Sequence, residues 1–353
     1  MNTNLLLRPL IAVAIPAGFL IAGVAGCASK IESDVILEST VDQEIAAPIL
    51  SAFHRAEQKL VQPTATFSAN ASDRDSFAKQ LAGKPGLATA DVIWTDDVLL
   101  VIDLQRRGLL TPRAWSLEPT FPRELRATDE SWCGFASVAR VLLVNTNRLP
   151  DAKDHPQSIE DLVDPRWKNR CAMAMPTSGT TAIHAAVIGQ AIGLEKANEW
   201  FTKVAANATI LRSNSAVAIA VANGQFDWGL TDSSDAVLEQ DANNPVAVVF
   251  PDQATSQFGT LRIPNAVAVL KDAPHPIAAG KLADYLVLAT TEERLAMSDA
   301  AQIPISRSTT FKPRVLPEMP VRWATVDFEK AEQIWQSLRP DLLTIFASSI
   351  DEQ

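Results

Sequence analysis

Residues 171–189 read CAMAMPTSGTTAIHAAVIG and predict an apolar strand, a tight polar turn at residues 176–181 and an Ala-rich helix. The first backbone N–H groups of a helix have no intrahelical partner, and the helix dipole adds partial positive charge there. Such a turn is suited to bind an anion. Gly179 allows a close approach to the backbone, and the hydroxyls of Ser178, Thr180 and Thr181 can donate hydrogen bonds. The alternative is that Thr177 or Ser178 only caps the helix.

Four further polar turns also follow a predicted strand and precede a predicted helix, at residues 40–42, 95–97, 213–215 and 232–235. Ligands of open α/β sheets bind outside the carboxyl ends of the strands, so we expect these turns to converge on one site. Each turn could instead serve as a helix cap, and Asp232 and Asp235 have the spacing of a capping box. The predicted ligand or anion contacts are Ser178, Gly179, Thr180, Thr181, Asn214 and Thr40, and the predicted metal or cation contacts are Asp42, Asp96, Asp97, Asp232 and Asp235.

Strand and helix patterns alternate from residue 34 onward, which predicts an α/β fold with mostly parallel sheets flanked by helices. Residues 109–135 lack periodicity, whereas residues 136–145 (ASVARVLLVN) predict a long strand that crosses into a second lobe. Residues 261–270 predict the strand that returns. The expected division is a signal peptide at 1–26, a discontinuous first lobe at 27–135 plus 262–353, and a second lobe at 136–261 with hinge strands at both ends.

The composition is that of an ordinary globular protein, with 353 residues of which 47% are hydrophobic, enough for two domains. The formal net charge is −10 and the sequence contains no basic cluster. Nucleic acid is therefore excluded as an expected partner. We expect a monomer.

The N-terminus carries Arg8 followed by the apolar run PLIAVAIPAGFLIAGVAGC, which predicts a secretory signal. Residues 24–27 (VAGC) resemble the bacterial lipobox, which implies that Cys27 is lipidated and that the exported protein is anchored to a membrane. The alternative is an uncleaved membrane anchor, because about 18 apolar residues are just long enough to span a bilayer. Cys133 and Cys171 remain, and the sequence does not choose between a disulfide and two separate buried thiols.

Several motifs carry a resemblance that covers nearly the whole mature chain: DPRWK at 164–168, PTSGTT at 176–181, NSAVA at 214–218, GLTDSSDA at 229–236, VAVVFPDQ at 246–253 and GTLRIPNAVAVLKDAPHP at 259–276. Together with the lipobox they resemble the ferric-ion-binding-protein family, the periplasmic solute-binding proteins of ABC importers. The resemblance implies the hinged, two-lobed type II periplasmic-binding fold, which closes on its ligand, and a permease partner. It also implies that Ser178, Gly179, Thr180 and Asn214 hold the phosphate or carbonate that accompanies iron in that family.

The sequence departs from this family at the metal ligands. Two adjacent tyrosines of the family correspond to Ser233 and Ser234, the single tyrosine Tyr285 has the pattern of core packing, and Val41-Asp42 replaces the family's histidine. The family's carboxylate is retained as Asp96. No cofactor is required, and three ligand classes stay open: Fe³⁺ or another metal with an anion, a zwitterion such as an aminophosphonate, and a sugar phosphate.

An enzyme is the rival of a different class, and the sequence gives it little support. Ser178 and His184 with an aspartate could be imagined as a hydrolase triad, but the chain has no G-x-S-x-G motif. It also has no phosphate loop or GxGxxG, and His54, His155 and His275 lack metal-ligand spacing. The expectation is a binding protein without catalytic residues.

Overall fold

The computed structural model describes residues 34–68, 74–84, 86, 88–309 and 311–348, which belong to one compact unit. Cys27 and the predicted signal peptide lie outside these residues. Within the described ranges, no helix combines the length and the apolar character that crossing a bilayer requires.

The described residues form a nine-stranded sheet in the order β2-β1-β3-β9-β4-β7-β5-β6, with β8 paired to β4. The strands are β1 (Asp34–Ser39), β2 (Gln62–Phe67), β3 (Val92–Thr95), β4 (Trp132–Asn145), β5 (Cys171–Ala174), β6 (Thr209–Leu211), β7 (Trp228–Asp232), β8 (Val246–Val249) and β9 (Arg262–Val269). We call β1, β2 and β3 with their helices the first lobe, and β5 to β8 with theirs the second.

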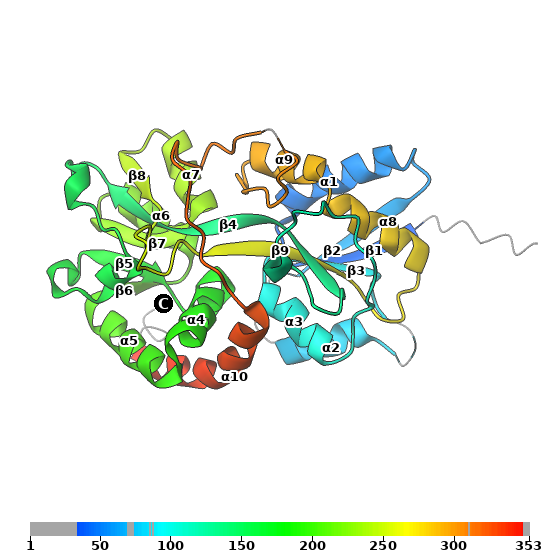
Figure 1. Cartoon of the computed structure of the whole chain (residues 1–353), viewed down its shortest axis with the longest axis horizontal. Coiled ribbons are helices and arrows are strands. Elements are labelled where there is room, and N and C mark those ends of the chain that lie inside the picture. The colour runs from blue at the N-terminus through cyan, green and yellow to red at the C-terminus, as the bar shows by residue number, and fades with distance from the viewer. Residues whose placement is uncertain (1–33, 69–73, 85, 87, 310, 349–353) are drawn as a thin grey trace, which may run out of the picture. The chain divides into compact units, whose positions relative to one another are not determined.

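Helices follow most strands, as the alternating pattern predicts (Figure 1). The α-helices are α1 (Gln43–Ala56), α2 (Arg74–Ala82), α3 (Val98–Arg106), α4 (Gly179–Ile192), α5 (Leu194–Asn207), α6 (Asn214–Ala222), α7 (Ser233–Asp241), α8 (Pro276–Leu286), α9 (Ala289–Met297) and α10 (Phe328–Ile345). Short 3-10 helices are η1 (Arg123–Leu125), η2 (Ala152–Asp154), η3 (Ile159–Val163) and η4 (Pro165–Trp167).

Strands within each lobe pair mainly in parallel, whereas the two long strands that join the lobes pair antiparallel. Within the first lobe β1 runs parallel to β2 and β3, and within the second β5 runs parallel to β6 and β7. The two long strands β4 and β9 pair antiparallel with each other and with their neighbours β3 and β7. The predicted parallel arrangement therefore holds inside each lobe, where helical crossovers make the connections.

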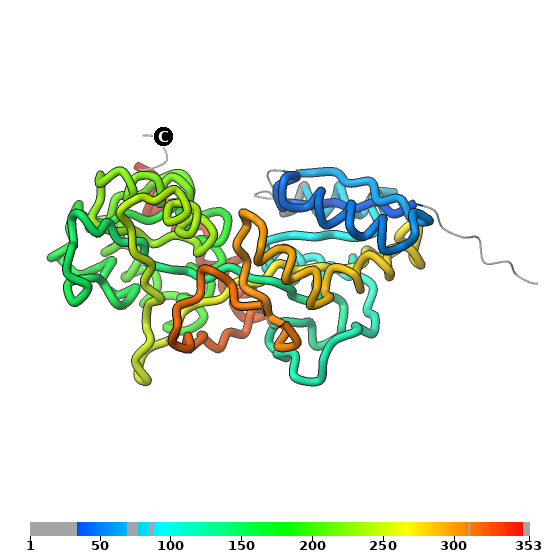
Figure 2. The backbone as a smooth tube through the Cα atoms, turned by 90° about the horizontal axis from the view of Figure 1, so that it is seen from above, coloured from blue at the N-terminus to red at the C-terminus, as the bar shows by residue number. Residues whose placement is uncertain are grey.

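Strand β4 belongs to both lobes because its pairing changes along its length. Residues 132–139 pair with β9, with an irregularity between Phe135 and Ser137, and residues 140–144 pair with β7. Figures 1 and 2 show β4 and β9 running between the two groups of elements. These are the two connecting strands that the sequence predicts, and β4 begins four residues earlier than the predicted residue 136. Their role as a hinge stays a prediction.

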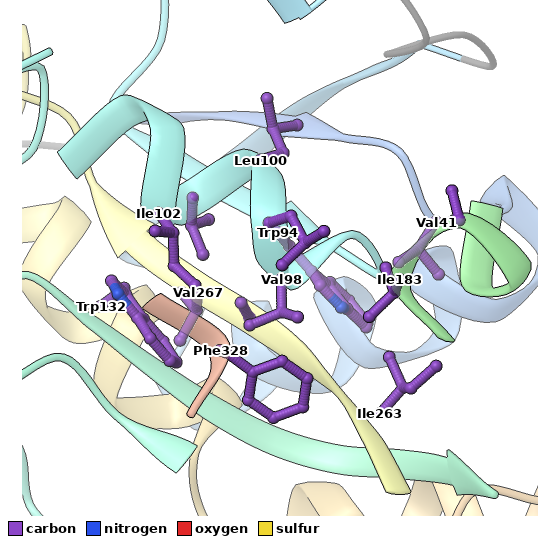
Figure 3. Close-up of a cluster of buried hydrophobic side chains, with 14 of the residues drawn as sticks. Val41, Trp94, Val98, Leu100, Ile102, Trp132, Ile183, Ile263, Val267 and Phe328 are labelled. Atoms are coloured by element: carbon purple, nitrogen blue, oxygen red, sulfur yellow. The ribbon is translucent and has the colours of Figure 1, made fainter. Parts of the chain in front are cut away.

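The hydrophobic core runs through both lobes. Its larger cluster joins fully buried Trp94 of β3 and Trp132 of β4 with Ile183 of α4. Figure 3 shows Ile183 beside Trp94 and Val41. A smaller cluster fills the other face of the second lobe, between β4, β5, α6 and residues 301–315. Gly229 permits this packing, because a Cβ there would lie 2.4 Å from Val217.

The C-terminal helix α10 packs on α4 and α5 of the second lobe as well as on α3 of the first. Its sequence position led us to expect it in the first lobe. The contacts show instead that α10 reaches both lobes, so the segment after the proposed boundary at residue 262 does not contact the first lobe alone.

Candidate functional site

Residues from four of the five predicted strand-end turns line a common cavity of about 240 Å³ between the lobes, and the turn at residues 213–215 does not line it. Thr40 and Asp42 follow β1, Asp96 follows β3, Thr180 lies in the first turn of α4, and Asp232 and Asp235 lie at the junction of β7 and α7. Hinge-strand residues 263–265 complete the wall together with Val41, Ile45, Val138, Ser234, Ala300 and Gln302. The carboxyl ends of strands from both lobes therefore meet here, which is where open α/β sheets place their ligands.

On the first-lobe side, Asp96 is held by a short chain of hydroxyl groups. Thr40 Oγ1 donates to Asp96 Oδ1 at 2.8 Å and lies 2.7 Å from Thr95 Oγ1, which is then the donor to Thr40. Asp96 is an exposed residue, and partial desolvation by the surrounding cavity wall raises its pKa to about 6. The hydrogen bond from Thr40 opposes this shift in pKa, and the charges of Asp97 and Asp232 add to it.

Two further carboxylates face the cavity without a hydrogen bond to any described residue, namely those of Asp42 and Asp235. Asp42 precedes α1 but its side chain does not cap that helix. Burial, followed by the nearby charge of Asp232, raises the pKa of Asp235 to about 7. Both groups have oxygens available for a ligand.

The second-lobe side is organised by Arg140, a fully buried residue of β4. Its guanidinium donates to Asp232 Oδ1 at 2.6 Å, to Thr180 Oγ1 at 3.1 Å and to Thr181 Oγ1 at 3.3 Å. The other oxygen of Asp232 accepts from Thr180 at 2.6 Å and from Asn214 Nδ2 at 3.0 Å. Arg140 Nε is buried and has no hydrogen-bond partner within the described chain.

This network changes the interpretation of Asp232. The sequence reasoning placed Asp232 among carboxylates that need a cation from the ligand, whereas the structure supplies the positive charge from within the protein. The same network includes Thr180, Thr181 and Asn214, which also form hydrogen bonds with one another. Arg140 was not among the predicted site residues. The sequence feature that could have identified Arg140 is that it is the only charged residue between positions 132 and 147.

The predicted anion-binding turn lies at the exposed N-terminus of α4. Ser178 and Gly179 are exposed, and the Ser178 side chain makes no capping hydrogen bond. Gly179 has φ +59° and open space where a Cβ would stand, so its backbone can approach a ligand closely. Neither residue lines the cavity, although the next residue, Thr180, does. The role of this turn stays a prediction.

Asp97 differs from its neighbour Asp96. Its Oδ1 accepts from the N–H groups of Leu99 and Leu100 at 3.1 and 3.2 Å, and it does not line the cavity. The capping alternative therefore describes the contacts of Asp97.

The two serines at the family's tyrosine positions have different surroundings. Ser233 is fully buried and its Oγ accepts from the N–H of Ala139 at 3.0 Å, whereas Ser234 lines the cavity. Tyr285 of α8 packs edge-to-face on Phe53 with ring centroids 5.4 Å apart, in the core of the first lobe. The prediction that Tyr285 is a packing residue is confirmed.

His184 and the cysteines are buried away from solvent. His184 lies in α4, and burial followed by the charge of Arg140 lowers its pKa to about 3. Cys133 of β4 and Cys171 of β5 are both free thiols, which answers the question that the sequence left open. No group of three or more His, Cys, Asp or Glu side chains in the described ranges is arranged to hold a metal ion.

Comparison with known proteins identifies the family. The profile of the bacterial extracellular solute-binding proteins matches residues 89–332. The chain belongs to this family. Among its curated relatives, Iron uptake protein A1 of Synechocystis sp. is 27% identical over 251 residues, which cover 66% of this chain and 68% of that protein. The Major ferric iron-binding protein of Neisseria meningitidis is 26% identical over 213 residues, or 60% of this chain and 62% of the relative.

Solved structures show that this family member has the two-lobed type II periplasmic-binding fold. Iron-bound HitA from Pseudomonas aeruginosa superimposes with a TM-score of 0.73 at 24% identity, covering 88% of this chain and 99% of HitA. The periplasmic binding protein AfuA from Actinobacillus pleuropneumoniae, with fructose-6-phosphate bound, also gives 0.73 at 21% identity, covering 89% and 98%. The predicted family and fold are confirmed.

Proposed function

We propose that the protein captures iron(III), or a similar hard cation, together with an anion in the interlobe cavity and delivers it to an ABC importer. The observation that supports this most is the presence of Asp42, Asp96 and Asp235 on the wall of one cavity. Hard cations prefer oxygen ligands, and crowded carboxylates repel one another until a cation lies between them. The curated relatives named for iron uptake and ferric iron binding support the same ligand class.

The proposed roles divide the aspartates into two groups. Asp42 and Asp235 have free oxygens, and Asp96 becomes an available ligand when it loses its proton. Asp232 is already paired with Arg140 and serves to position the second-lobe side of the site. The accompanying anion would bind at the edge of the cavity, at Ser178 and Gly179 beside the lining residue Thr180, where the first N–H groups of α4 and the helix dipole favour negative charge.

We also propose that the two lobes close on the ligand. Asp42 and Asp96 belong to the first lobe and Asp235 to the second, so a cation bound to all three would tie the lobes together. A ligand shifts a conformational equilibrium only through contacts that differ between the two states, and these bridging contacts do differ. Small-angle scattering should record compaction on addition of a ligand whose binding calorimetry has established. A constant radius of gyration would contradict closure.

The cellular setting completes the proposal. The protein would be exported, lipidated at Cys27, held at a membrane and partnered by an importer permease, acting without catalysis. Mass spectrometry of protein from native membranes tests the anchor directly. An unmodified Cys27 or an intact Met1 terminus would contradict it.

One observation favours a second candidate, a phosphorylated sugar. The AfuA structure has the same fold and carries fructose-6-phosphate. In this chain the uncharged polar residues Thr40, Asn265 and Gln302 also line the cavity and could bind hydroxyl groups. Zwitterionic solutes such as aminophosphonates would use the same anion turn and the same carboxylates.

Ligand binding separates these candidates. The purified protein should be titrated by calorimetry with ferric citrate, ferric phosphate, fructose-6-phosphate and an aminophosphonate. If the ligand is a metal, Asp235→Asn should weaken binding by at least tenfold, because a charge-assisted contact contributes about 1.5–3 kcal/mol. Asp97→Asn is the matched control, since Asp97 caps α3 and should leave binding unchanged. Tight binding of fructose-6-phosphate that survives Asp235→Asn would replace iron with the sugar phosphate.

A further inference from the structure

A second cavity, of about 320 Å³, lies beside the hinge and shares no lining residue with the first. Its polar lining includes Arg262, Arg307, Glu124, Trp323, Thr120 and Thr325. Arg262 is the first residue of β9 and pairs with Ala139 of β4. From the next residue, Arg140, strand β4 pairs with β7. The cavity therefore adjoins the crossing of the two lobes.

Arg262 presents an unused guanidinium to this cavity. Its side chain stacks over Trp323 with 5.2 Å from Cζ to the ring centroid, and it makes no hydrogen bond or ion pair with the described residues. Arginine carries five N–H donors, which can bind the oxygens of an anion. Burial lowers the pKa of Arg262, whereas the nearby charges of Glu124 and Glu292 raise that pKa and the charge of Arg307 lowers it.

Arg307 is the second guanidinium of the cavity. It is exposed, and its side chain has no hydrogen bond or ion pair within the described ranges. Because both arginines lack acceptors, ten N–H donors of the pair are open to a ligand. Planar guanidinium groups match the geometry of carboxylate and phosphate oxygens.

The acidic side chains near the pair do not satisfy it. Glu292 accepts three backbone N–H groups, from Ala136, Ile305 and Ser306. Glu118 accepts from the backbone of Arg307 and from the Ser308 hydroxyl. Glu124 lines the cavity and acts on Arg262 through its charge without forming an ion pair. Among the described residues that line the cavity, one acidic side chain, that of Glu124, stands against two arginines.

We propose that this hinge cavity is a second binding site, in which Arg262 and Arg307 hold one small carboxylate- or phosphate-bearing anion. Trp323 keeps the Arg262 guanidinium oriented, and Thr120 and Thr325 offer further hydroxyl donors. A pocket with walls from four segments of the chain suits a small diffusible molecule rather than the side chain of another protein. This site is independent of the cation proposed for the interlobe cavity.

Calorimetric titration of the full chain with inorganic phosphate, and separately with succinate, tests the proposal at constant ionic strength. The experiment uses Gly179→Trp protein, in which the exposed turn of α4 is blocked, so that binding at the predicted cleft turn does not contribute. Arg262→Gln and Arg307→Gln should each weaken binding about tenfold to a hundredfold, the range expected when a charged hydrogen-bonding partner is lost. Arg123→Gln is the matched control, because Arg123 adjoins Glu124 but does not line the cavity. It should change the affinity by less than about twofold.

Several results would overturn the proposal: no saturable binding of either anion in the Gly179→Trp protein, or equal affinity in the Arg262 and Arg307 variants and the control. If Arg262→Gln does not fold, the exposed Arg307→Gln decides alone. Unchanged anion binding combined with loss of permease binding in these variants would mean that the arginines contact a protein, which also contradicts a small-molecule site. Ferric binding should be unaffected by Arg307→Gln, so failure here leaves the proposed function intact.

Discussion

Replacing Arg140 by methionine should destabilise the protein by about 3–5 kcal/mol, the usual cost of removing one partner of a buried ion pair. The structure gives the reason for a value in this range. Arg140 has no exposed surface and the Asp232 side chain is only 10% exposed, so water cannot replace the lost guanidinium. Asp232 Oδ1 would lose its donor at 2.6 Å, and Thr180 and Thr181 would lose theirs. A carboxylate would then remain buried without a neutralising charge.

Urea unfolding followed by both circular dichroism and tryptophan fluorescence measures this cost, since coincident transitions are needed for a two-state free energy. The control is Lys330→Met, which removes a Lys–Asp pair whose side chains are 69% and 42% exposed, and which should cost below about 1 kcal/mol. Adding Asp232→Asn to Arg140→Met should recover at least about 1 kcal/mol, because the unpaired charge is gone. A change below 1 kcal/mol in Arg140→Met, or strictly additive effects in the double variant, would refute the role given to this pair.

The remaining predictions concern the other strand-end carboxylates and the single tyrosine. Because burial raises the pKa of Asp96 to about 6 and of Asp235 to about 7, the folded protein binds these protons more tightly than the unfolded chain, so their contribution to stability falls as pH rises from about 4 to 7. Asp235→Asn should flatten that decline in a series of thermal melts, and cation affinity in the wild type should rise over the same interval. Asp97→Ala should lower the free energy of unfolding by about 1 kcal/mol through loss of the α3 cap while leaving ligand affinity unchanged. Any ferric complex should lack the strong visible absorption of tyrosinate ligands, and Tyr285→Phe should not change its spectrum.

Much of the fold follows from periodicity and turn chemistry, which are local properties. The strand and helix predicted within residues 171–189 are β5 and α4, and the strand predicted at 261–270 is β9 within one residue at each end. Gly108 and Gly224 follow the ends of α3 and α6 with positive φ, as helix-terminating glycines do. The three-residue strand β6 was predicted only as the strand before the turn at residues 213–215, and its bounds were not predicted, because so short a run carries no measurable alternation.

The contacts of the site join residues that are far apart in the sequence, so local patterns do not predict them. Arg140 and Asp232 are 92 residues apart and meet because β4 and β7 pair antiparallel with these two residues in register. A hydrophobic pattern specifies the register where the two faces of a strand differ, whereas β4 is buried on both faces and its pattern does not distinguish them. A charged residue inside a long apolar strand does signal a buried partner, but it does not name that partner.

The strand-end aspartates show why residue type and turn position do not determine function. Asp97 and Asp232 both directly precede a helix, yet the Asp97 side chain caps α3 whereas the Asp232 side chain caps nothing and pairs with Arg140. Asp235, three residues further on, has the position of a capping-box acid but keeps its oxygens free toward the cavity. The difference lies in the opposing strand: Arg140 satisfies Asp232, so the next carboxylate along α7 is the one left for a ligand. A ligand with positive charge is therefore expected to contact Asp235 and not Asp232. Substituting each of the two aspartates in turn distinguishes a structural carboxylate from a binding one.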